Sequence, residues 1–110
     1  MKESAISREI RNFLRDVMGF SVYSTEQGYR KDRGGTRQTP GIPDLIIFGK
    51  GIFAFVEVKT PKGKLRDSQK QFQSDCDNCD PVIPYLVWRD VRDAFDWLLE
   101  IGVITQSDIT

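Results

Sequence analysis

Two acidic residues and a lysine in the middle of the sequence have the types and the spacing of a metal-assisted phosphate site. Asp44 opens one apolar run, and Glu57, 13 positions later, follows a second apolar run. Successive side chains of a β-strand point to opposite faces, so Glu57 and Lys59 share one face while Val58 lies on the other. If the two runs pair as neighbouring strands, Asp44 reaches the face of Glu57 and Lys59. Two carboxylates beside one ammonium group predict a Mg²⁺ site suited to phosphate chemistry.

A further acidic candidate lies in a helix predicted at the N-terminus. Apolar residues recur there with helical spacing, and the pattern predicts a helix that ends near Gly19. Glu3 falls at the edge of the apolar stripe, where a metal site beneath the helix would supply it with a partner. The alternative is an ordinary acidic residue in the first helical turn, which the helix dipole favours. Glu9 is the weaker candidate, because it is turned further from the stripe.

The other elements follow from hydrophobic periodicity and turn signals. Residues 44–48 and 52–59 form the two apolar strands, and the connection Gly49-Lys50-Gly51 predicts a three-residue hairpin between antiparallel neighbours. Besides these strands and the N-terminal helix, the expected elements are a short strand over 20–25, a helix over 66–77, a strand over 84–88 and a helix over 91–101. The order α-β-β-β-α-β-α predicts an α/β fold.

Length and composition exclude several classes of protein. A chain of 110 residues predicts one domain over 1–110. No apolar run is long enough to span a membrane, and the N-terminus lacks the apolar stretch of a signal peptide, so we expect a cytoplasmic protein without a membrane partner. The sequence contains no histidine, which excludes His-based nucleases, Ser-His-Asp hydrolases and His-ligated zinc. Cys76 and Cys79 lack a second cysteine pair, so we expect free thiols in preference to structural zinc.

Charge is distributed unevenly along the chain, although the formal net charge is zero. Residues 1–74 contain 14 Lys/Arg against 8 Asp/Glu, a balance of +6, whereas residues 75–110 contain 2 against 8, a balance of −6. The first part therefore has the charge to face a polyanion, with two ordinary solvated surfaces as the alternative. Two basic segments bracket the predicted site and favour a phosphate-binding cleft over solvated loops. Their candidate DNA-binding residues are Arg30, Lys31, Arg33 and Arg37 before Asp44, and Lys62, Lys64 and Arg66 after Lys59.

Two segments around the predicted site carry a resemblance to a known family. The sequence reads TPGIPDLI over residues 39–46 and FVEVKTPKGKLRDSQ over residues 55–69. These motifs, together with the helix that begins at Glu3, resemble the VRR-NUC family, a branch of the PD-(D/E)XK nuclease superfamily. The resemblance implies a restriction-endonuclease-like fold with a mixed central sheet flanked by helices. It places the active site where Asp44 and Glu57 diverge from the hairpin.

The resemblance also implies a role for each candidate residue. The implied ligands of Mg²⁺ or Mn²⁺ are Asp44, Glu57 and the carbonyl oxygen of Val58. Glu3 is the helix acid, which binds a metal-bound water or a second ion. Lys59 holds or deprotonates the attacking water, and Gln69 orients Lys59 or that water. Hydrolysis in this superfamily usually leaves a 5′-phosphate and a 3′-hydroxyl.

Small stand-alone members of this family are phage or bacterial proteins and resemble junction-resolving enzymes that act as homodimers. We therefore expect a metal-dependent DNA endonuclease that selects branched DNA and acts as a homodimer. The apolar residues of the last helix and of the tail over residues 101–104 either form the interface or only close the core. Two alternatives remain open at this stage. One is a non-catalytic nucleic-acid-binding module on the nuclease fold. The other is a nuclease with the same site chemistry that acts on flap DNA, on RNA or on mismatched duplexes.

Overall fold

The computed structural model describes residues 1–25, 39–105 and 107. The described elements, in chain order, are helix α1 (Glu3–Asn12), the π-helical segment η1 (Phe13–Val17), strands β1 (Ser21–Ser24), β2 (Leu45–Gly49) and β3 (Ile52–Val58), helix α2 (Asp67–Asp77), strand β4 (Tyr85–Trp88) and helix α3 (Val91–Glu100). The basic segment before Asp44, with Arg30, Lys31, Arg33 and Arg37, lies outside the described residues.

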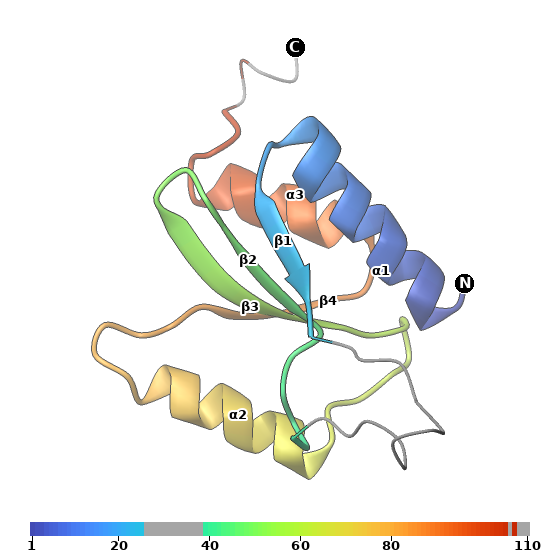
Figure 1. Ribbon diagram of the computed structural model, residues 1–110, viewed down its shortest axis with the longest axis vertical. Helices are drawn as coiled ribbons and strands as arrows, with labels where there is room; N and C mark the ends of the chain where they lie inside the picture. The colour runs from blue at the N-terminus through green and yellow to red at the C-terminus, as the bar shows by residue number, and fades with distance from the viewer. Residues whose placement is uncertain (26–38, 106, 108–110) are drawn as a thin grey trace, which may run out of the picture.

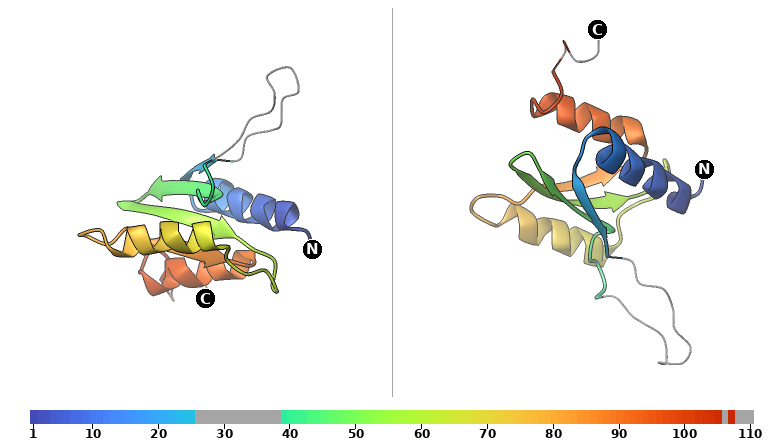
Figure 2. Two further views of the ribbon diagram at one scale, coloured as in Figure 1. Left: turned by 90° about the horizontal axis from the view of Figure 1, so that it is seen from below. Right: turned by 45° about the horizontal axis from the view of Figure 1, so that its top comes forward.

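The four strands form one mixed sheet in the order β1-β2-β3-β4. β1 pairs with β2 and β2 pairs with β3 in antiparallel fashion, whereas β3 and β4 are parallel and are connected through α2. Helices α1 and α3 cover one face of the sheet and α2 lies on the other (Figures 1 and 2). The mixed sheet flanked by helices confirms the predicted fold class.

The core lies between the sheet and the pair α1 and α3. Alternate residues of the central strands point into it, among them Ile47 and Val56, which are fully buried. Ile10 and Leu14 from the N-terminal helical segment and Leu98 of α3 meet them from the other side. Each such side chain contributes about 1.5–3 kcal/mol when it leaves water. The buried face holds the ends of β2 and β3 at a fixed separation.

The β2–β3 hairpin is tighter than the sequence predicts. Gly49 belongs to β2 and pairs with Ile52, so the connection is the two-residue turn Lys50-Gly51 and the predicted three-residue connection is wrong. Both turn residues have positive φ, 53° for Lys50 and 78° for Gly51. This is the pattern of a type I′ turn, whose twist matches that of antiparallel strands.

The N-terminal helix ends close to the predicted position but in a different form. Its last turn is η1, in which the amide of Met18 donates to the carbonyl oxygen of Phe13 at 3.1 Å. Gly19, with φ of 73°, then ends the helical path. Cys76 and Cys79, at and just after the end of α2, do not form a disulfide. Within the described residues, no helix combines the length and the apolar character that crossing a membrane requires.

Candidate active site

The site forms where β2 begins and β3 ends. Leu45 pairs with Val56, and extension of this register by one position puts Asp44 opposite Glu57. Beyond the last backbone pair of β2 and β3, the Asp44 side chain provides the next hydrogen bond between them: its Oδ2 accepts from the amide of Val58 at 2.8 Å. The predicted arrangement of Asp44 beside Glu57 is therefore present, and the amide of Val58 fixes the Asp44 carboxylate.

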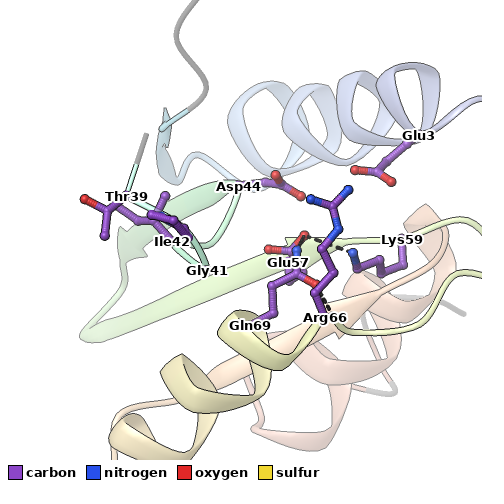
Figure 3. A pocket seen from close by; sticks show the side chains of 10 residues that line it. Glu3, Thr39, Gly41, Ile42, Asp44, Glu57, Lys59, Arg66 and Gln69 are labelled. Atoms are coloured by element: carbon purple, nitrogen blue, oxygen red, sulfur yellow. Dashed lines mark hydrogen bonds and ion pairs between the residues drawn. The ribbon is translucent and has the colours of Figure 1, made fainter. Parts of the chain in front are cut away.

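Helix α1 adds a third carboxylate to this pair. Oxygens of Glu3, Asp44 and Glu57 all lie within 4.8 Å of one another. Glu3 is the first residue of α1, and Figure 3 shows its carboxylate above the strand ends. Glu9, which is exposed as Glu3 is, lies outside this acidic cluster, so α1 contributes Glu3, the residue that the apolar stripe favours.

Glu57 is the most enclosed member of the acidic cluster, with only 2% of its surface exposed. Its Oε2 accepts a hydrogen bond from Gln69 Nε2 at 3.2 Å and lies 3.7 Å from Lys59 Nζ. Within the described residues, its Oε1 is buried without a hydrogen-bond partner. Burial, and after it the negative charge of Asp44, raises the pKa of Glu57 to about 8, because both disfavour a second buried anion.

These residues fit a hard divalent cation. Carboxylate oxygens are the donors that Mg²⁺ and Mn²⁺ prefer. Three such groups converge within 4.8 Å, where their mutual repulsion calls for a positive charge. The buried Oε1 of Glu57 has no hydrogen-bond partner in the described part of the chain and can therefore coordinate an ion.

Lys59 lies beside Glu57 on the predicted face of the strand. Val58, the residue between them in the sequence, is buried in the core. The backbone amide of Lys59 donates to the carbonyl oxygen of Trp88 at 3.0 Å, so the end of β3 stays attached to β4 at this point. Only 7% of Lys59 is exposed. Its ammonium group is therefore held at the floor of the site by packing, rather than free in solvent.

Gln69 contacts Glu57 in the structure, whereas the resemblance assigns it to Lys59 or a water. Its Nε2 donates to Glu57, and its Oε1 accepts from the amide of Arg66 at 2.8 Å. One amide group thus ties the N-terminus of α2 to the most buried carboxylate. Gln69 holds Glu57 in place relative to the helix.

The acidic cluster opens into a pocket of about 380 Å³. One wall is the segment before β2, where Gly41 has φ of 87° and a Cβ atom would lie 2.3 Å from the carbonyl oxygen of Ser68. Only glycine allows this close approach to α2. Lys62 and Lys64 are exposed and do not line the pocket, whereas Arg66 does. The lining residues are Glu3, Thr39, Pro40, Gly41, Ile42, Asp44, Glu57, Lys59, Arg66 and Gln69.

Arg89, just after β4, is a residue that the sequence patterns did not identify. Its Nη1 donates to the carbonyl oxygens of Thr60 and Gly63, each at 2.7 Å. These bonds hold the loop that leads from Lys59 to α2. One signal was present in the sequence, since Arg89 is one of only 2 Lys/Arg in the acidic segment 75–110.

A mixed sheet between helices, with carboxylates and a lysine at the diverging ends of two central strands, defines a nuclease-type domain of the restriction-endonuclease-like class. The family comparison agrees: the VRR-NUC domain model matches residues 6–87, which include Asp44, Glu57, Lys59 and Gln69. The chain belongs to the VRR-NUC domain family. Glu3 lies before the matched residues. Searches of curated proteins and of solved structures gave no match.

Proposed function

We propose that this protein is a DNA endonuclease that depends on Mg²⁺ or Mn²⁺. The observation that carries the proposal is the convergence of Glu3, Asp44 and Glu57 within 4.8 Å, with Lys59 Nζ 3.7 Å from Glu57, in a chain of the VRR-NUC family. A binding module would have no need to bury a glutamate and a lysine together beside two further carboxylates. The intact set of side chains therefore favours catalysis over the non-catalytic alternative.

Each residue of the chain has a task in this reaction. Asp44, Glu57 and the carbonyl oxygen of Val58 are the proposed metal ligands, with Glu3 as the outer acid. The ion supplies Lewis-acid activation of water and of the phosphate when it is bound. Lys59 orients the attacking water and offsets the charge that gathers on the phosphate; to act as the general base it would first have to give up its own proton. The water oxygen bonds to phosphorus as the P–O3′ bond breaks. The attacking water gives its proton to solvent and the leaving 3′-oxygen takes a proton from solvent, which gives a 5′-phosphate and a 3′-hydroxyl.

The substrate that we propose is branched DNA, cut by a homodimer. Lys62, Lys64 and Arg66 supply positive charge close to the site, and phosphate contacts of this kind position a duplex without reading its sequence. Flap DNA and RNA are the alternative substrates, because the same residues would act on any phosphodiester that reaches them. These choices differ in shape recognition and leave the chemistry unchanged.

The test is cleavage of four-way junction, flap, linear duplex and RNA substrates by purified protein in Mg²⁺, Mn²⁺ or EDTA. We expect cleavage only with a divalent ion, and loss of cleavage in Asp44→Ala and Glu57→Ala with nucleic-acid binding retained. Glu3→Ala is compared with Glu9→Ala, a matched control on the same helix that leaves the acidic cluster complete. Glu9→Ala should cut at the wild-type rate.

Three outcomes would contradict the proposal. Strong cleavage in EDTA would exclude the metal-dependent reaction. Activity in both Asp44→Ala and Glu57→Ala would place the active site elsewhere. Tight binding of every substrate without cleavage in either ion would favour the non-catalytic binding module.

A further inference from the structure

The first position of α2 is occupied by an unusual residue. Arg66 is the N-cap of this helix and has an extended backbone, with φ of −77° and ψ of 163°. N-cap positions favour serine, threonine, aspartate and asparagine, whose oxygens accept from the first amides of the helix. An arginine side chain has no acceptor and cannot do this. A serine here would serve the helix better, so the reason for an arginine lies in what its side chain reaches.

The guanidinium of Arg66 reaches into the active-site pocket. Figure 3 shows the side chain rising from the start of α2 and pointing between Asp44 and Glu3, above Glu57. Arg66 is also one of the residues that line the pocket. Lys59, from the end of β3, lines the same pocket, so two cations of different shape reach one space from two different elements.

The Arg66 guanidinium has no protein partner among residues 1–25, 39–105 and 107. The ion pairs within 4.0 Å in this part of the chain are Lys59 with Glu57 and Arg92 with Asp96. Arg89, on the other side of the same loop, shows the contrast, because carbonyl oxygens of Thr60 and Gly63 hold its guanidinium. Arg66 thus points toward the carboxylates without forming an ion pair with them in the described part of the chain.

An arginine that has no partner in the described part of the chain matches the chemistry of a phosphodiester. The planar fork of a guanidinium donates two parallel hydrogen bonds to phosphate oxygens, a geometry that an ammonium group cannot reproduce. A phosphate directly above the acidic cluster would lie between Lys59 on the floor and Arg66 on the rim. The two non-bridging oxygens then have a donor available from the rim side.

We propose that Arg66 is a further catalytic residue, which holds the non-bridging oxygens of the scissile phosphate; this rests on the proposed nuclease function. As the water oxygen bonds to phosphorus and the P–O3′ bond breaks, negative charge grows on these oxygens. A positioned donor stabilises the transition state more than it stabilises the bound substrate, so it raises the cleavage rate at saturating substrate. Lys62 and Lys64, outside the pocket, act on affinity alone.

The first test compares Arg66→Ser, Arg66→Lys and Lys70→Ser in single-turnover cleavage with protein in excess. Lys70→Ser is the matched control, because it removes the same charge from the exposed surface of the same helix outside the pocket. We expect Arg66→Ser to be slower by about a hundredfold or more, the scale of one lost transition-state donor. Arg66→Lys should recover only part of the rate, and Lys70→Ser should stay within about twofold of wild type.

Thermal unfolding of the same variants separates a catalytic role from a structural one. Serine is the better N-cap, so Arg66→Ser should unfold at or above the wild-type temperature while its cleavage rate falls. A variant that is both slower and clearly less stable would overturn the inference, because damage to α2 would then explain the loss.

The second test places a neutral methylphosphonate at the mapped cleavage position and measures binding with Ca²⁺ in place of Mg²⁺, under conditions without cleavage. The substitution should weaken wild-type binding more than binding by Arg66→Ser, since the variant has already lost the contact. Equal weakening would overturn the phosphate contact.

The two proposals fail in different ways. If wild-type protein cuts DNA and Arg66→Ser cuts it equally fast at saturation, the inference is wrong and the nuclease assignment stands. A loss confined to affinity would likewise overturn the catalytic role. If wild-type protein cuts no substrate with any divalent ion, the proposed function fails and the inference fails with it.

Discussion

Glu57 is the residue whose environment most constrains the chemistry of the site. Its side chain is 2% exposed, and it shares a small volume with Asp44, Glu3 and Lys59. Lys59 favours the ionised carboxylate, but burial and the two acidic neighbours outweigh it and raise the pKa to about 8. A bound cation would reverse this balance, so metal binding at neutral pH displaces a proton from the site.

The raised pKa of Glu57 predicts how stability depends on pH without metal. The folded carboxyl holds its proton up to about pH 8, whereas the unfolded one releases it near 4.5. Protonation therefore favours the folded state: this contribution is fully present below pH 4.5 and is lost as pH rises toward 8. We expect the melting temperature in EDTA to fall between pH 5 and pH 8, measured by thermal scans.

Two further scans test the assignment to Glu57. Glu57→Gln, which keeps the shape and cannot ionise, should show a flatter profile over the same pH range. Added Mg²⁺ should raise the wild-type melting temperature more at pH 8 than at pH 5.5, because fewer protons then compete with the ion. The same slope in wild type and Glu57→Gln would contradict the prediction.

Lys59 should contribute to the rate through its charge. Because its ammonium group is held 3.7 Å from Glu57 at the floor of the pocket, Lys59→Ala should cut DNA about a hundredfold more slowly or worse, the scale of a lost electrostatic or general-base group. Lys59→Met, which keeps much of the apolar stem, should be equally slow. Lys59→Arg should recover only part of the rate, because a guanidinium is bulkier and does not deprotonate. Single-turnover rates close to wild type in Lys59→Ala would reduce this lysine to a scaffold role.

At the scale of elements, the loop between β3 and α2 connects the two halves of the site. It starts at Lys59 and ends at Arg66, and Arg89 holds it from the end of β4 through the carbonyl oxygens of Thr60 and Gly63. The backbone of Arg89 is itself fixed, since its amide donates to Asp93 Oδ2 at 2.8 Å. The parallel pairing of β3 and β4 therefore also positions the basic loop.

Loss of the hydrogen bonds from Arg89 to Thr60 and Gly63, called here the Arg89 clamp, should loosen this loop without removing a proposed metal ligand. Arg89→Ala gives up two charge-assisted hydrogen bonds, which are worth about 1.5–3 kcal/mol each at most, so the melting temperature should fall. DNA affinity should weaken by about tenfold, because each basic residue of a loosened loop must be ordered on binding. Hydrogen exchange over residues 60–66 should rise, while Mg²⁺ affinity stays close to wild type.

Arg92→Ala is the matched control for the Arg89 experiment. Arg92 is exposed and pairs with Asp96 one turn along α3, and surface pairs of this kind contribute at most about 1 kcal/mol. Arg92→Ala should leave exchange over residues 60–66 and DNA affinity unchanged. Equal effects of the two substitutions would show that net charge, and not the clamp, is responsible.

At the scale of the whole molecule, the chain has one set of Asp44, Glu57 and Lys59. In the proposed reaction one set would hydrolyse one strand at each encounter, and symmetric cutting of a four-way junction would need two sets at a fixed separation. Large apolar side chains remain exposed in the chain, including Val17 at 71%, Phe53 at 46% and Ile101 at 42%. Such surfaces are suitable material for contact between two copies.

We predict a homodimer that cuts branched DNA in preference to linear duplex. Light scattering at assay concentration should give twice the chain mass of 12.6 kDa, and the junction should outcompete flap and linear DNA of equal length. Ile101→Glu should shift the mass toward the monomer and reduce the preference for junctions if the tail forms the interface. A monomer that cuts all three substrates equally would refute the dimeric resolvase while leaving the metal-dependent chemistry intact.

The amino-acid sequence by itself determined the parts of this site that depend on local periodicity. Alternation along a strand is enough to put Glu57 and Lys59 on one face and Val58 on the other, and two apolar runs around a glycine-rich turn are enough to pair Asp44 with Glu57. Helical phase favoured Glu3 over Glu9, because Glu3 lies closer to the apolar stripe, but it left the choice between them open.

Tertiary structure alone decided the contacts that cross between elements. Glu3 contacts the ends of β2 and β3 because α1 packs over the sheet with its first turn above these ends. Helical phase does not predict which end of the helix lies there. Gln69 reaches Glu57 instead of Lys59, and Arg89 closes on a loop 26 to 29 residues away. These contacts depend on how whole elements pack against one another. The two-residue period of a strand and the 3.6-residue period of a helix do not encode that packing. The raised pKa of Glu57 has the same origin, because burial is a property of the assembled fold.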